Sequence, residues 1–465
     1  MSTYYRDPVT KELIFRIASP RVTFEEDDDG SIVEVDLRSS HPFGSQPKAI
    51  TTVFIGDSLT GNGFLSNGTV SYDTYGPFYT GGTFARTEDY GFATWADFIS
   101  SGALGNVLNS GIGGNTTSDI LARVQADVLA YSPKLVIDES GTNDVIAGAT
   151  AAEIITRKSQ LFSLYRSIGA KIVAVDISPR VGFTSPMRDV AVAVNRWLRQ
   201  QAATVPGLGL FPLSAILADY ASFTGGVSAE RTFDDTHPNN LGAFLGGRGL
   251  ADHAGLAGFL KIRSSIWPGD AYGSSNSDAI IRNTNPGMAY VSGGTANTGI
   301  TGEVADGYTC SRLVGTPTVV ASVVERPDGL GFNQRLVITF AAASDAIEFG
   351  IPTASSRYLS GRKIGIGAGI EFDASSANVV NRCILYTAAV VGGQTYQATA
   401  LNQQSATRRA NLPLSSGYVK GYAKAPRLQV PAGTATGFSA QLRVYASAAG
   451  VVTLDISQFG ITQHP

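Results

Sequence analysis

Short apolar runs separated by amphipathic stretches dominate the chain from residue 49 to about residue 262. The runs are ITTVFIGDS, NVLNSGIGG, KLVIDESGTND, AKIVAVDIS and LGLFPL. Between them, apolar residues follow helical spacing at 117–130, 151–168, 188–203 and 241–262. Strands that alternate with helices predict a parallel sheet with helices on both faces, and such sheets bind ligands outside the carboxyl ends of their strands.

The pattern changes after Trp267 and Pro268, where GDAYGSSNSD leads into a Gly-, Ala-, Thr- and Val-rich region without a convincing helix. Apolar residues alternate there with polar ones, so that each run places its apolar side chains on one face. The runs are Leu336, Ile338 and Phe340; Ile347, Phe349 and Ile351; Leu442 and Val444; and Val452, Leu454 and Ile456. We predict an all-β sandwich.

The first 47 residues form a third region. In RVTFEEDDDGSIVEVDLR, two alternating runs flank an Asp-Asp-Gly turn, which predicts a β-hairpin. We expect a β-rich leader that attaches or packs the chain at 1–47, an α/β domain at 48–266 and the sandwich at 267–465. Three domains fit a chain of 465 residues, since domains usually hold roughly 100 to 200 residues.

Composition narrows the function class. With 43% hydrophobic residues, 16% charged residues and a net charge of −3, the chain is typical of a soluble globular protein. It lacks the basic patch of a nucleic-acid binder, and its charged N-terminus and broken apolar runs predict neither a secretory signal nor a membrane span. Cys310 and Cys383 are the only cysteines; we predict buried thiols, with one disulfide as the alternative.

Four histidines occur, and one of them has the surroundings of a catalytic base. His41 lies in the leader, His464 beside the C-terminus and His253 within a predicted helix, where it is a surface or core residue. His237, in FDDTHPNN, lies in a turn-rich stretch before the last helix of the α/β domain. Asp234, three residues earlier, can reach its Nδ1 hydrogen and leave Nε2 free, and Asp235 is the alternative partner.

Ser58 is the candidate nucleophile. It follows the first strand in GDS, at the edge where such a sheet binds ligands. No G-x-S-x-G occurs, which argues against the common α/β-hydrolase arrangement. The turns NSGIGGNTTSD and GTND follow the next two strands, where glycine N–H groups and the Asn143 side chain could stabilise an oxyanion. GIGG does not complete a dinucleotide fingerprint, because Thr116 stands where the third glycine would be.

GDS, NSGIGGNTTSD, GTND and D-x-x-H-P occur in the order and spacing of the SGNH hydrolases, also called GDSL esterases, and residues 49–262 resemble this family. The resemblance implies a three-layer α/β/α fold, no metal and no organic cofactor. It also implies roles for individual residues. Ser58, Asp234 and His237 would be the catalytic triad; Ser58, Gly114 and Asn143 the oxyanion donors, with Gly113 as the alternative glycine; and Asp57 and Asp144 would support the loops.

About 30 residues between Gly61 and Tyr90 replace a loop that usually has about 2 to 6 residues. Because this insertion begins three residues after Ser58, we expect it to form a wall or lid of the substrate site. Its aromatic residues could stack on sugars, with simple packing as the alternative. These candidate substrate-binding residues are Tyr72, Tyr75, Phe78 and Tyr79.

The family includes carbohydrate O-acetyl esterases, lipases, lysophospholipases and thioesterases. We predict removal of O-acetyl groups from a polysaccharide, because the α/β domain is joined to a sandwich, the insertion is aromatic and polar, and no membrane-docking helix is evident. The C-terminal region resembles the accessory β-domains of bacteriophage tail-associated deacetylases, which implies a virion-associated homotrimer. The alternatives are a lipid or thioester hydrolase, and a glycan-binding adhesin with an inert hydrolase domain.

Overall fold

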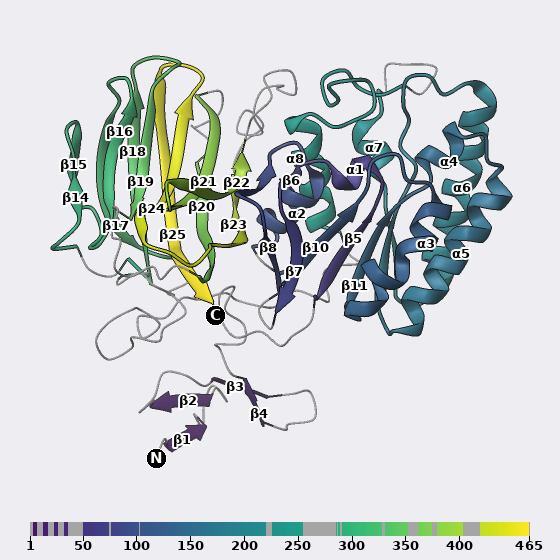
Figure 1. Ribbon diagram of the computed structural model, residues 1–465, viewed down its shortest axis with the longest axis horizontal. Coiled ribbons are helices and arrows are strands. Elements are labelled where there is room, and N and C mark those ends of the chain that lie inside the picture. Colours follow the sequence, from purple (N-terminus) through teal and green to yellow (C-terminus); the bar gives the residue numbers. More distant parts are fainter. Residues whose placement is uncertain are drawn as a thin grey trace.

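The computed structural model describes two units that lie side by side, an α/β unit and a β-sandwich (Figure 1). The described residues are 3–6, 13–16, 23–26, 32–35, 50–73, 76–101, 103–219, 226–253, 285, 287–288, 291–327, 331–351, 361–373, 379–402 and 419–464. Tyr75, Trp267 and Pro268 lie outside these ranges.

Five described strands form the parallel sheet of the α/β unit, and each lies within one of the predicted apolar runs. They are β5 (Thr52–Gly56), β10 (Val107–Gly111), β11 (Leu135–Glu139), β12 (Lys171–Val175) and β13 (Leu208–Phe211). The order is β10-β5-β11-β12-β13, so the chain leaves β5 to one side and later returns to its other side. Such a topological switch point is where open α/β sheets bind ligands.

Helices cover both faces of this sheet, as predicted. One face packs against α3 (Thr117–Asp127), α5 (Ala151–Ser167) and α6 (Ser185–Thr204), and the other against α2 (Phe92–Ile99), α7 (Leu213–Leu217) and α8 (Asn240–Ala251). Alternation along β5 explains the two layers, since Val53 and Ile55 join the first core and Phe54 joins the second. The three-layer α/β/α architecture is thereby confirmed.

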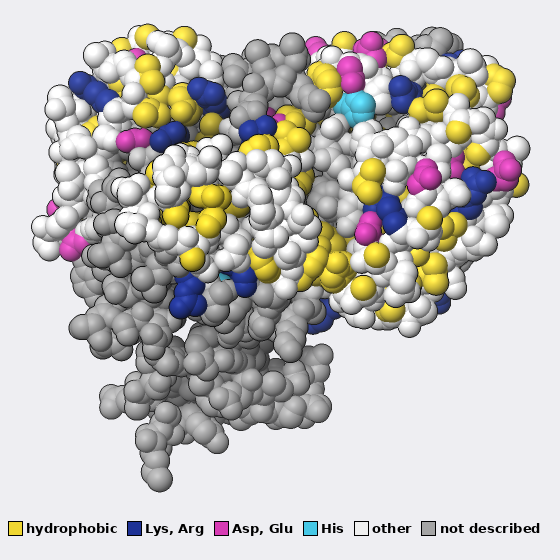
Figure 2. All heavy atoms as spheres, viewed as in Figure 1, with side chains coloured by type: hydrophobic (Ala, Val, Ile, Leu, Met, Phe, Trp, Pro, Cys, Tyr) yellow, Lys and Arg dark blue, Asp and Glu magenta, His cyan; other side chains and the backbone are white. Residues whose placement is uncertain are grey.

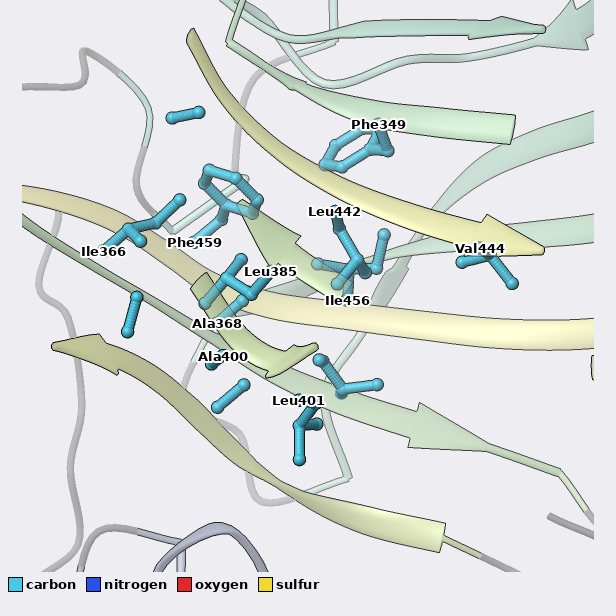
Figure 3. Packing of buried hydrophobic residues seen from close by; sticks show 14 of the residues in the cluster. Phe349, Ile366, Ala368, Leu385, Ala400, Leu401, Leu442, Val444, Ile456 and Phe459 are labelled. Carbon is cyan, nitrogen blue, oxygen red and sulfur yellow. The ribbon is translucent and has the colours of Figure 1, made fainter. Parts of the chain in front are cut away.

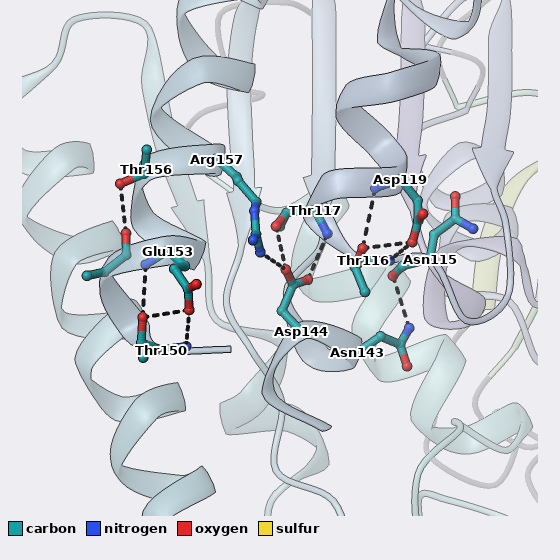
Figure 4. A network of polar contacts seen from close by, with 11 residues as sticks. Asn115, Thr116, Thr117, Asp119, Asn143, Asp144, Thr150, Glu153, Thr156 and Arg157 are labelled. Carbon is teal, nitrogen blue, oxygen red and sulfur yellow. Dashed lines mark hydrogen bonds and ion pairs between the residues drawn. The ribbon is translucent and has the colours of Figure 1, made fainter. Parts of the chain in front are cut away.

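The helix boundaries follow local capping chemistry. Thr116 with Asp119, and Thr150 with Glu153, form capping boxes that begin α3 and α5 (Figure 4). The last predicted helix begins at Asn240, after an Asn239 side chain that accepts a hydrogen bond from the backbone of Gly242. The helix ends at Ala251, with Asp252 as its C-cap, so it stops short of the predicted residue 262; residues 254–262 lie outside the described ranges.

The sandwich consists of two sheets, each with eight strands among the described residues. In spatial order, the first sheet is β14 (Thr295–Ala296), β16 (Thr309–Val314), β19 (Ala346–Ile351), β24 (Ala435–Ala446), β21 (Val380–Val391), β22 (Gln394–Asn402), β9 (Phe84–Glu88) and β6 (Phe64–Ser66). The second is β15 (Ile300–Gly302), β17 (Thr318–Glu325), β18 (Phe332–Phe340), β25 (Gly450–His464), β20 (Lys363–Phe372), β23 (Val419–Gln429), β8 (Gly76–Thr80) and β7 (Thr69–Asp73).

The core of the sandwich lies between these sheets, and the alternating runs of the sequence supply it. Leu336, Ile338 and Phe340 are all buried, as are the apolar residues predicted on β19, β24 and β25. Figure 3 shows Phe349, Leu442, Val444 and Ile456 pointing toward one another between the strands. The predicted sandwich is therefore confirmed for the described strands.

The insertion after Ser58, predicted to form a wall or lid of the substrate site, folds as part of the sandwich. Its strands β6, β7, β8 and β9 extend both sheets of the sandwich, and Figure 1 shows the labelled ones between the sandwich and the α/β unit. β9 pairs with β22 and β8 with β23, both in parallel register. The backbone groups at these sheet edges are satisfied by strands more than 300 residues distant in the sequence. The expected boundary between two separate domains is thus bridged by this segment.

Two further predictions concern local features. The leader contains the predicted hairpin, in which β3 (Thr23–Glu26) and β4 (Ile32–Val35) pair antiparallel; β1 (Thr3–Arg6) and β2 (Leu13–Arg16) pair in the same way. Cys310 and Cys383 are free thiols, which excludes the alternative of one disulfide between them. Burial raises the pKa of Cys310 to about 12, so its thiol is un-ionised at neutral pH.

Candidate active site

The sequence GDS folds into a sharp turn from β5 into the short helix α1 (Ser58–Gly61). The Asp57 carboxylate caps this helix by accepting a hydrogen bond from the backbone N–H of Leu59 at 2.9 Å. Gly56 is required just before it, because a Cβ there would lie 2.1 Å from the carbonyl oxygen of Glu139. The turn presents a half-buried Ser58 at the carboxyl edge of the sheet.

The structure brings Ser58 and His237 together although 179 residues separate them. Ser58 Oγ lies 2.8 Å from His237 Nε2, and His237 Nδ1 lies 2.7 Å from Asp234 Oδ2. With the imidazole proton on Nδ1, Nε2 can accept the proton of the serine hydroxyl. These two distances, and the order serine, histidine and aspartate, are those of a nucleophile, its base and the carboxylate that orients the base.

A tight turn holds Asp234 against the imidazole. Asp235 adopts a left-handed backbone conformation with φ +60°, which reverses the chain and lets Asp234 Oδ1 accept hydrogen bonds from the backbone of Thr236 and His237 at 3.2 and 2.7 Å. Partial burial opposes the charge of Asp234, but the hydrogen bonds from His237 outweigh it and lower the pKa of this carboxyl. Asp234 is therefore the partner of His237 in this structure, and Asp235 supplies the bend.

The glycine turn after β10 lies beside the nucleophile. A Cβ on Gly113 would lie 3.7 Å from the Cβ of Ser58. Gly114 has φ +83°, a left-handed backbone conformation that favours glycine. A Cβ at this position would meet no atom within 4 Å, so the surroundings leave room for a side chain. Both glycines therefore remain candidates for the backbone donor.

Asn143 enters the site from the first turn of α4 (Thr142–Ile146). Its Nδ2 atom donates to Asp57 Oδ2 at 3.0 Å and to the carbonyl oxygen of Asn115 at 3.1 Å; Figure 4 shows the second of these contacts. A side-chain amide has two N–H hydrogens, so both are engaged in the free site. An acyl oxygen that binds to Asn143 must replace the contact with the Asn115 carbonyl or share the hydrogen with it.

A second buried acid, Glu139, lies behind Asp57. Burial raises the pKa of Glu139 well above its usual range, and the neighbouring Asp57 carboxylate raises it further. Asp57 accepts hydrogen bonds from Leu59 and Asn143, whereas the Thr60 hydroxyl at 3.1 Å donates to Glu139. Burial also raises the pKa of Asp57, but hydrogen bonds from the Leu59 backbone and the Glu139 side chain oppose that rise. Of the two acids we therefore assign the shared proton to Glu139, whose hydrogen bond to Asp57 completes a chain that ends at the Asn143 amide.

Arg123 on α3 fastens the strand ends around the site. Its guanidinium donates to the carbonyl oxygens of Gly56 at 2.9 Å and Ser110 at 2.7 Å, and to the side-chain oxygen of Asn115 at 2.8 Å. Asp127, one turn further along the helix, pairs with it. One side chain thus links the strand before Ser58 with both ends of the glycine turn.

Asp144 holds the same turn from the other side. Its carboxylate accepts hydrogen bonds from the backbone and the hydroxyl of Thr117 at 2.7 and 2.5 Å, and Arg157 lies 3.2 Å away (Figure 4). The contacts of Asp57 and Asp144 are those expected of residues that support loops. Sequence reasoning missed Glu139, Arg123 and Arg157; the available signal was the pair of acids that ends the apolar run KLVIDES, because buried acids need partners.

The aromatic residues of the insertion are packed, which corrects the expectation that they stack on sugars. Phe78 and Tyr79 are 7% and 6% exposed. The Lys363 ammonium lies 4.3 Å from the centre of the Phe78 ring, and Tyr79 joins the core of the sandwich. Tyr72 packs its ring on Tyr131 with centroids 4.6 Å apart. The packing alternative therefore holds for these three residues, and Tyr75 lies outside the described residues.

His253 Nε2 donates a hydrogen bond to the Leu210 carbonyl oxygen at 2.7 Å, and the ring packs edge-on against Phe211, as a core residue does. Within the described ranges, no group of three or more His, Cys, Asp and Glu side chains could hold a metal ion, and no helix has the length and hydrophobicity of a membrane span. On the face shown in Figure 2, basic and acidic side chains are interspersed.

Sequence comparison assigns residues 54–243 to the model of the GDSL-like Lipase/Acylhydrolase family. An arylesterase of Vibrio mimicus is 35% identical over 71 residues, which are 15% of this chain and 36% of that protein. An uncharacterized lipoprotein of Bacillus subtilis is 44% identical over 52 residues, or 11% of this chain and 21% of that protein. The chain thus spans about a third or less of the length of these curated relatives.

Two solved structures are similar to this chain at low sequence identity. An acetylxylan esterase from Geobacillus stearothermophilus, solved as a catalytic mutant, is 21% identical and covers 47% of this chain and 99% of its own, with a TM-score of 0.36. A GDSL-like lipase from Bacteroides thetaiotaomicron is 16% identical and covers 45% of this chain and 88% of its own, with a TM-score of 0.33.

Proposed function

Since residues 54–243 form a GDSL-like lipase/acylhydrolase domain, we propose that the protein is a serine esterase that removes O-acetyl groups from a polysaccharide. The observation that carries the proposal is the array of Ser58, His237 and Asp234, with 2.8 and 2.7 Å between successive side chains. The local similarity to an arylesterase supports the ester as the bond that is cleaved.

In the first half of the reaction, His237 Nε2 takes the proton of Ser58 while Oγ attacks the ester carbonyl. Asp234 stabilises the imidazolium that forms, and its lowered pKa keeps it charged for that purpose. The imidazolium then gives its proton to the leaving sugar hydroxyl, and the acetyl group remains on Ser58. Water, deprotonated by His237, attacks this acetyl ester and releases acetate.

The negative oxygen of each tetrahedral intermediate is stabilised by N–H groups of Ser58, of Gly114 or Gly113, and of Asn143. Asn143 can donate once its hydrogen bond to the Asn115 carbonyl is exchanged for one to the oxyanion. A charged acceptor forms the stronger hydrogen bond, so this exchange favours the transition state over the resting enzyme. During this exchange, the hydrogen bond from Asn143 to Asp57 keeps the plane of the Asn143 amide fixed.

Exposure of the triad supports a polymeric substrate with a small acyl group. The His237 and Asp234 side chains are 24% and 40% exposed. A polysaccharide continues on both sides of an acetylated sugar, so its ester must be reached from solvent. The contact between the two units supports the same proposal. Lys424 of β23 forms an ion pair with Asp97 of α2 at 2.9 Å, which holds the sandwich against the α/β unit.

A lipid or thioester hydrolase is the second candidate, and one observation favours it. Exposed apolar side chains follow three strands at the carboxyl edge of the sheet: Ile112 and Val181, in loops, are 48% and 56% exposed, and Ile146, at the end of α4, is 41% exposed. Such residues could contact a longer acyl chain. The third candidate, an adhesin with an inert hydrolase domain, is disfavoured because the nucleophile, base and orienting acid are all in reacting distance.

Acetate release from a panel of acetylated bacterial and plant polysaccharides tests the proposal, beside p-nitrophenyl esters of increasing chain length. We expect release by the wild type and none by Ser58→Ala, with preference for the shortest ester. Preference for long chains would favour the lipid candidate, and activity that survives in Ser58→Ala would refute the assigned nucleophile. The homotrimer and the association with a virion remain proposals, and light scattering of the purified chain tests the first.

A further inference from the structure

The phenyl ring of Phe233 is stacked on the imidazole ring of His237. The two ring centroids lie 5.8 Å apart, and the ring planes are inclined by 22°. Aromatic pairs prefer offset stacking at such a separation. Phe233 takes no direct part in the proton transfers, because its side chain has neither a titratable group nor a hydrogen-bond donor. Its contact with the base therefore calls for a different role.

The backbone of the catalytic turn places these two rings opposite each other. The Phe233 N–H donates to the carbonyl oxygen of His237 at 3.1 Å, and Thr232 and Pro238 form an antiparallel bridge on either side of this bond. Asp235, with φ +60°, supplies the bend between them. Phe233 and His237 are thus the first and last residues of a closed turn, and their side chains meet face to face.

The turn is also held by contacts that do not involve the Phe233 side chain. The carbonyl oxygen of Asp235 accepts a hydrogen bond at 3.1 Å from the backbone N–H of Val181, in the loop between β12 and α6. Asp234 Oδ1 accepts two more from the backbone within the turn. Because these are bonds to backbone groups, we expect the turn to keep its shape when the phenyl ring is replaced.

The two hydrogen bonds of the imidazole leave one of its motions free. Nδ1 lies 2.7 Å from Asp234 Oδ2, and Nε2 lies 2.8 Å from Ser58 Oγ. Both bonds lie at the edge of the ring, so they select its direction but allow it to tilt about the line that joins its nitrogens. The His237 side chain is 24% exposed and is not enclosed on all sides. A second ring against its face opposes this tilt.

The same contact favours the charged form of the base. The face of an aromatic ring carries negative charge density and attracts a cation that lies within about 6 Å of its centre. The separation of 5.8 Å falls within that range. His237 becomes an imidazolium only after it takes the proton of Ser58, so the attraction is stronger in the transition state than in the resting enzyme.

We propose that Phe233 is a positioning residue for ester hydrolysis: its ring keeps the His237 imidazole in the orientation for proton transfer and stabilises the imidazolium. The inference rests on the proposed function, because it assigns Phe233 a part in that reaction. It requires the aromatic face. Leucine at this position would be apolar but would lack that face, whereas tyrosine would keep it.

Steady-state kinetics of the full chain with p-nitrophenyl acetate compares these two replacements. We expect Phe233→Leu to lower kcat about two- to fivefold, as loss of one exposed cation–π contact does, with KM unchanged because the ring contacts the base. Phe233→Tyr should keep a higher kcat than Phe233→Leu. Phe84→Leu is the matched control, since Phe84 is also half-buried but packs on Arg86 in the sandwich, and it should keep the wild-type kcat.

A double variant separates positioning from general damage. Residues that act as one unit have non-additive effects. If Phe233 acts through His237, adding Phe233→Leu to His237→Ala should not lower the residual rate further. An equal loss with and without His237 would show that the ring only supports the fold. Melting temperatures of all variants identify any that is not folded.

Nuclear magnetic resonance gives a readout that does not depend on ester hydrolysis. The chain has four histidines, so selective ¹³C labelling of histidine rings assigns His237 as the signal that His237→Ala lacks. Phe233→Leu should lower the order parameter of this ring, and Phe233→Tyr should not. An unchanged order parameter, or an unchanged kcat in Phe233→Leu, would overturn the inference. Failure of the esterase proposal is distinct, because it appears as absent ester hydrolysis in the wild type.

Discussion

The side-chain amide of Asn143 donates to the carboxylate of Asp57 at 3.0 Å, across 86 positions of sequence. Asp57 adjoins the nucleophile and Asn143 is the proposed oxyanion donor, so this bond sets the amide relative to Ser58. Behind it, the protonated Glu139 donates to Asp57 and the Thr60 hydroxyl donates to Glu139. The proposed oxyanion site is therefore supported by a buried chain of polar groups that the catalytic motifs alone do not reveal.

Removal of the Asn143 amide should impair the chemical step more than substrate binding. We expect Asn143→Ala to lower kcat by roughly 10²- to 10³-fold with little change in KM, as loss of one oxyanion donor does. Steady-state kinetics with p-nitrophenyl acetate gives both constants. An unchanged kcat in a variant with a wild-type circular dichroism spectrum would remove Asn143 from the site.

Glu139→Gln should keep activity and change the pH dependence of stability. Glutamine can still donate a hydrogen bond to Asp57, so kcat should stay near the wild-type value, whereas Glu139→Ala should lower it. The raised pKa means that folding keeps Glu139 protonated while the unfolded chain ionises near its ordinary value of 4.5. The stability that the neutral acid contributes is therefore fully present below pH 4.5 and is lost as the pH rises toward the folded pKa.

Melting temperatures of both proteins from pH 4.5 upward measure this effect. Relative to wild type, the glutamine variant should become more stable with rising pH, because it has no carboxyl to ionise. A constant difference across the range would show that Glu139 is not held protonated, and a large loss of kcat in Glu139→Gln would show that the carboxyl itself is needed.

Asp234 and the adjacent Asp235 form a matched pair for the triad. Asp234→Asn should lower kcat by about 10³- to 10⁴-fold, because an amide no longer selects the productive imidazole tautomer. Asp235→Asn should have a small effect, since asparagine also accepts the left-handed backbone at φ +60° and the side chain does not hold the ring. The reverse order of the two effects would assign the orienting role to Asp235.

A buried ion pair beneath the third motif should dominate the stability of the α/β unit. Lys158 Nζ lies 2.9 Å from Asp138 Oδ1, both side chains are fully buried, and the hydroxyls of Ser140 and Tyr165 complete the cluster. Lys158→Met should lower the free energy of unfolding by about 3 to 5 kcal/mol, because it leaves a buried charge unpaired.

Urea denaturation measures this loss. The double variant Lys158→Met with Asp138→Asn should lose less than the single one, because the uncompensated charge is gone. Lys134→Ala, at an exposed position, serves as the control and should change stability little. If Lys158→Met were as stable as Lys134→Ala, the pairing of Lys158 with Asp138 would not be the stabilising contact that we assign.

The sequence by itself determined the elements and the order of the motifs. Strand and helix periodicity are local, so the apolar runs gave all five described strands of the parallel sheet and the alternating runs gave the sandwich core. Parallel strands end at one edge, so motifs that follow β5, β10 and β11 had to meet there. That reasoning placed Ser58, the glycine turn and Asn143 at one edge, whereas His237 was assigned from its turn-rich surroundings and from the resemblance to the SGNH hydrolases.

Only the tertiary structure decided where the insertion goes and which atoms are already engaged. Strand pairing depends on which sheet edge is open, and β8 meets β23 across more than 300 residues, a distance at which no local pattern carries information. The same pairing buried Phe78 and Tyr79, whose sequence pattern also suits exposed sugar-binding residues. Likewise, both hydrogens of the Asn143 amide are occupied and the pKa of Glu139 is raised, because close packing places specific acceptors beside the amide and buries Glu139 next to the Asp57 carboxylate.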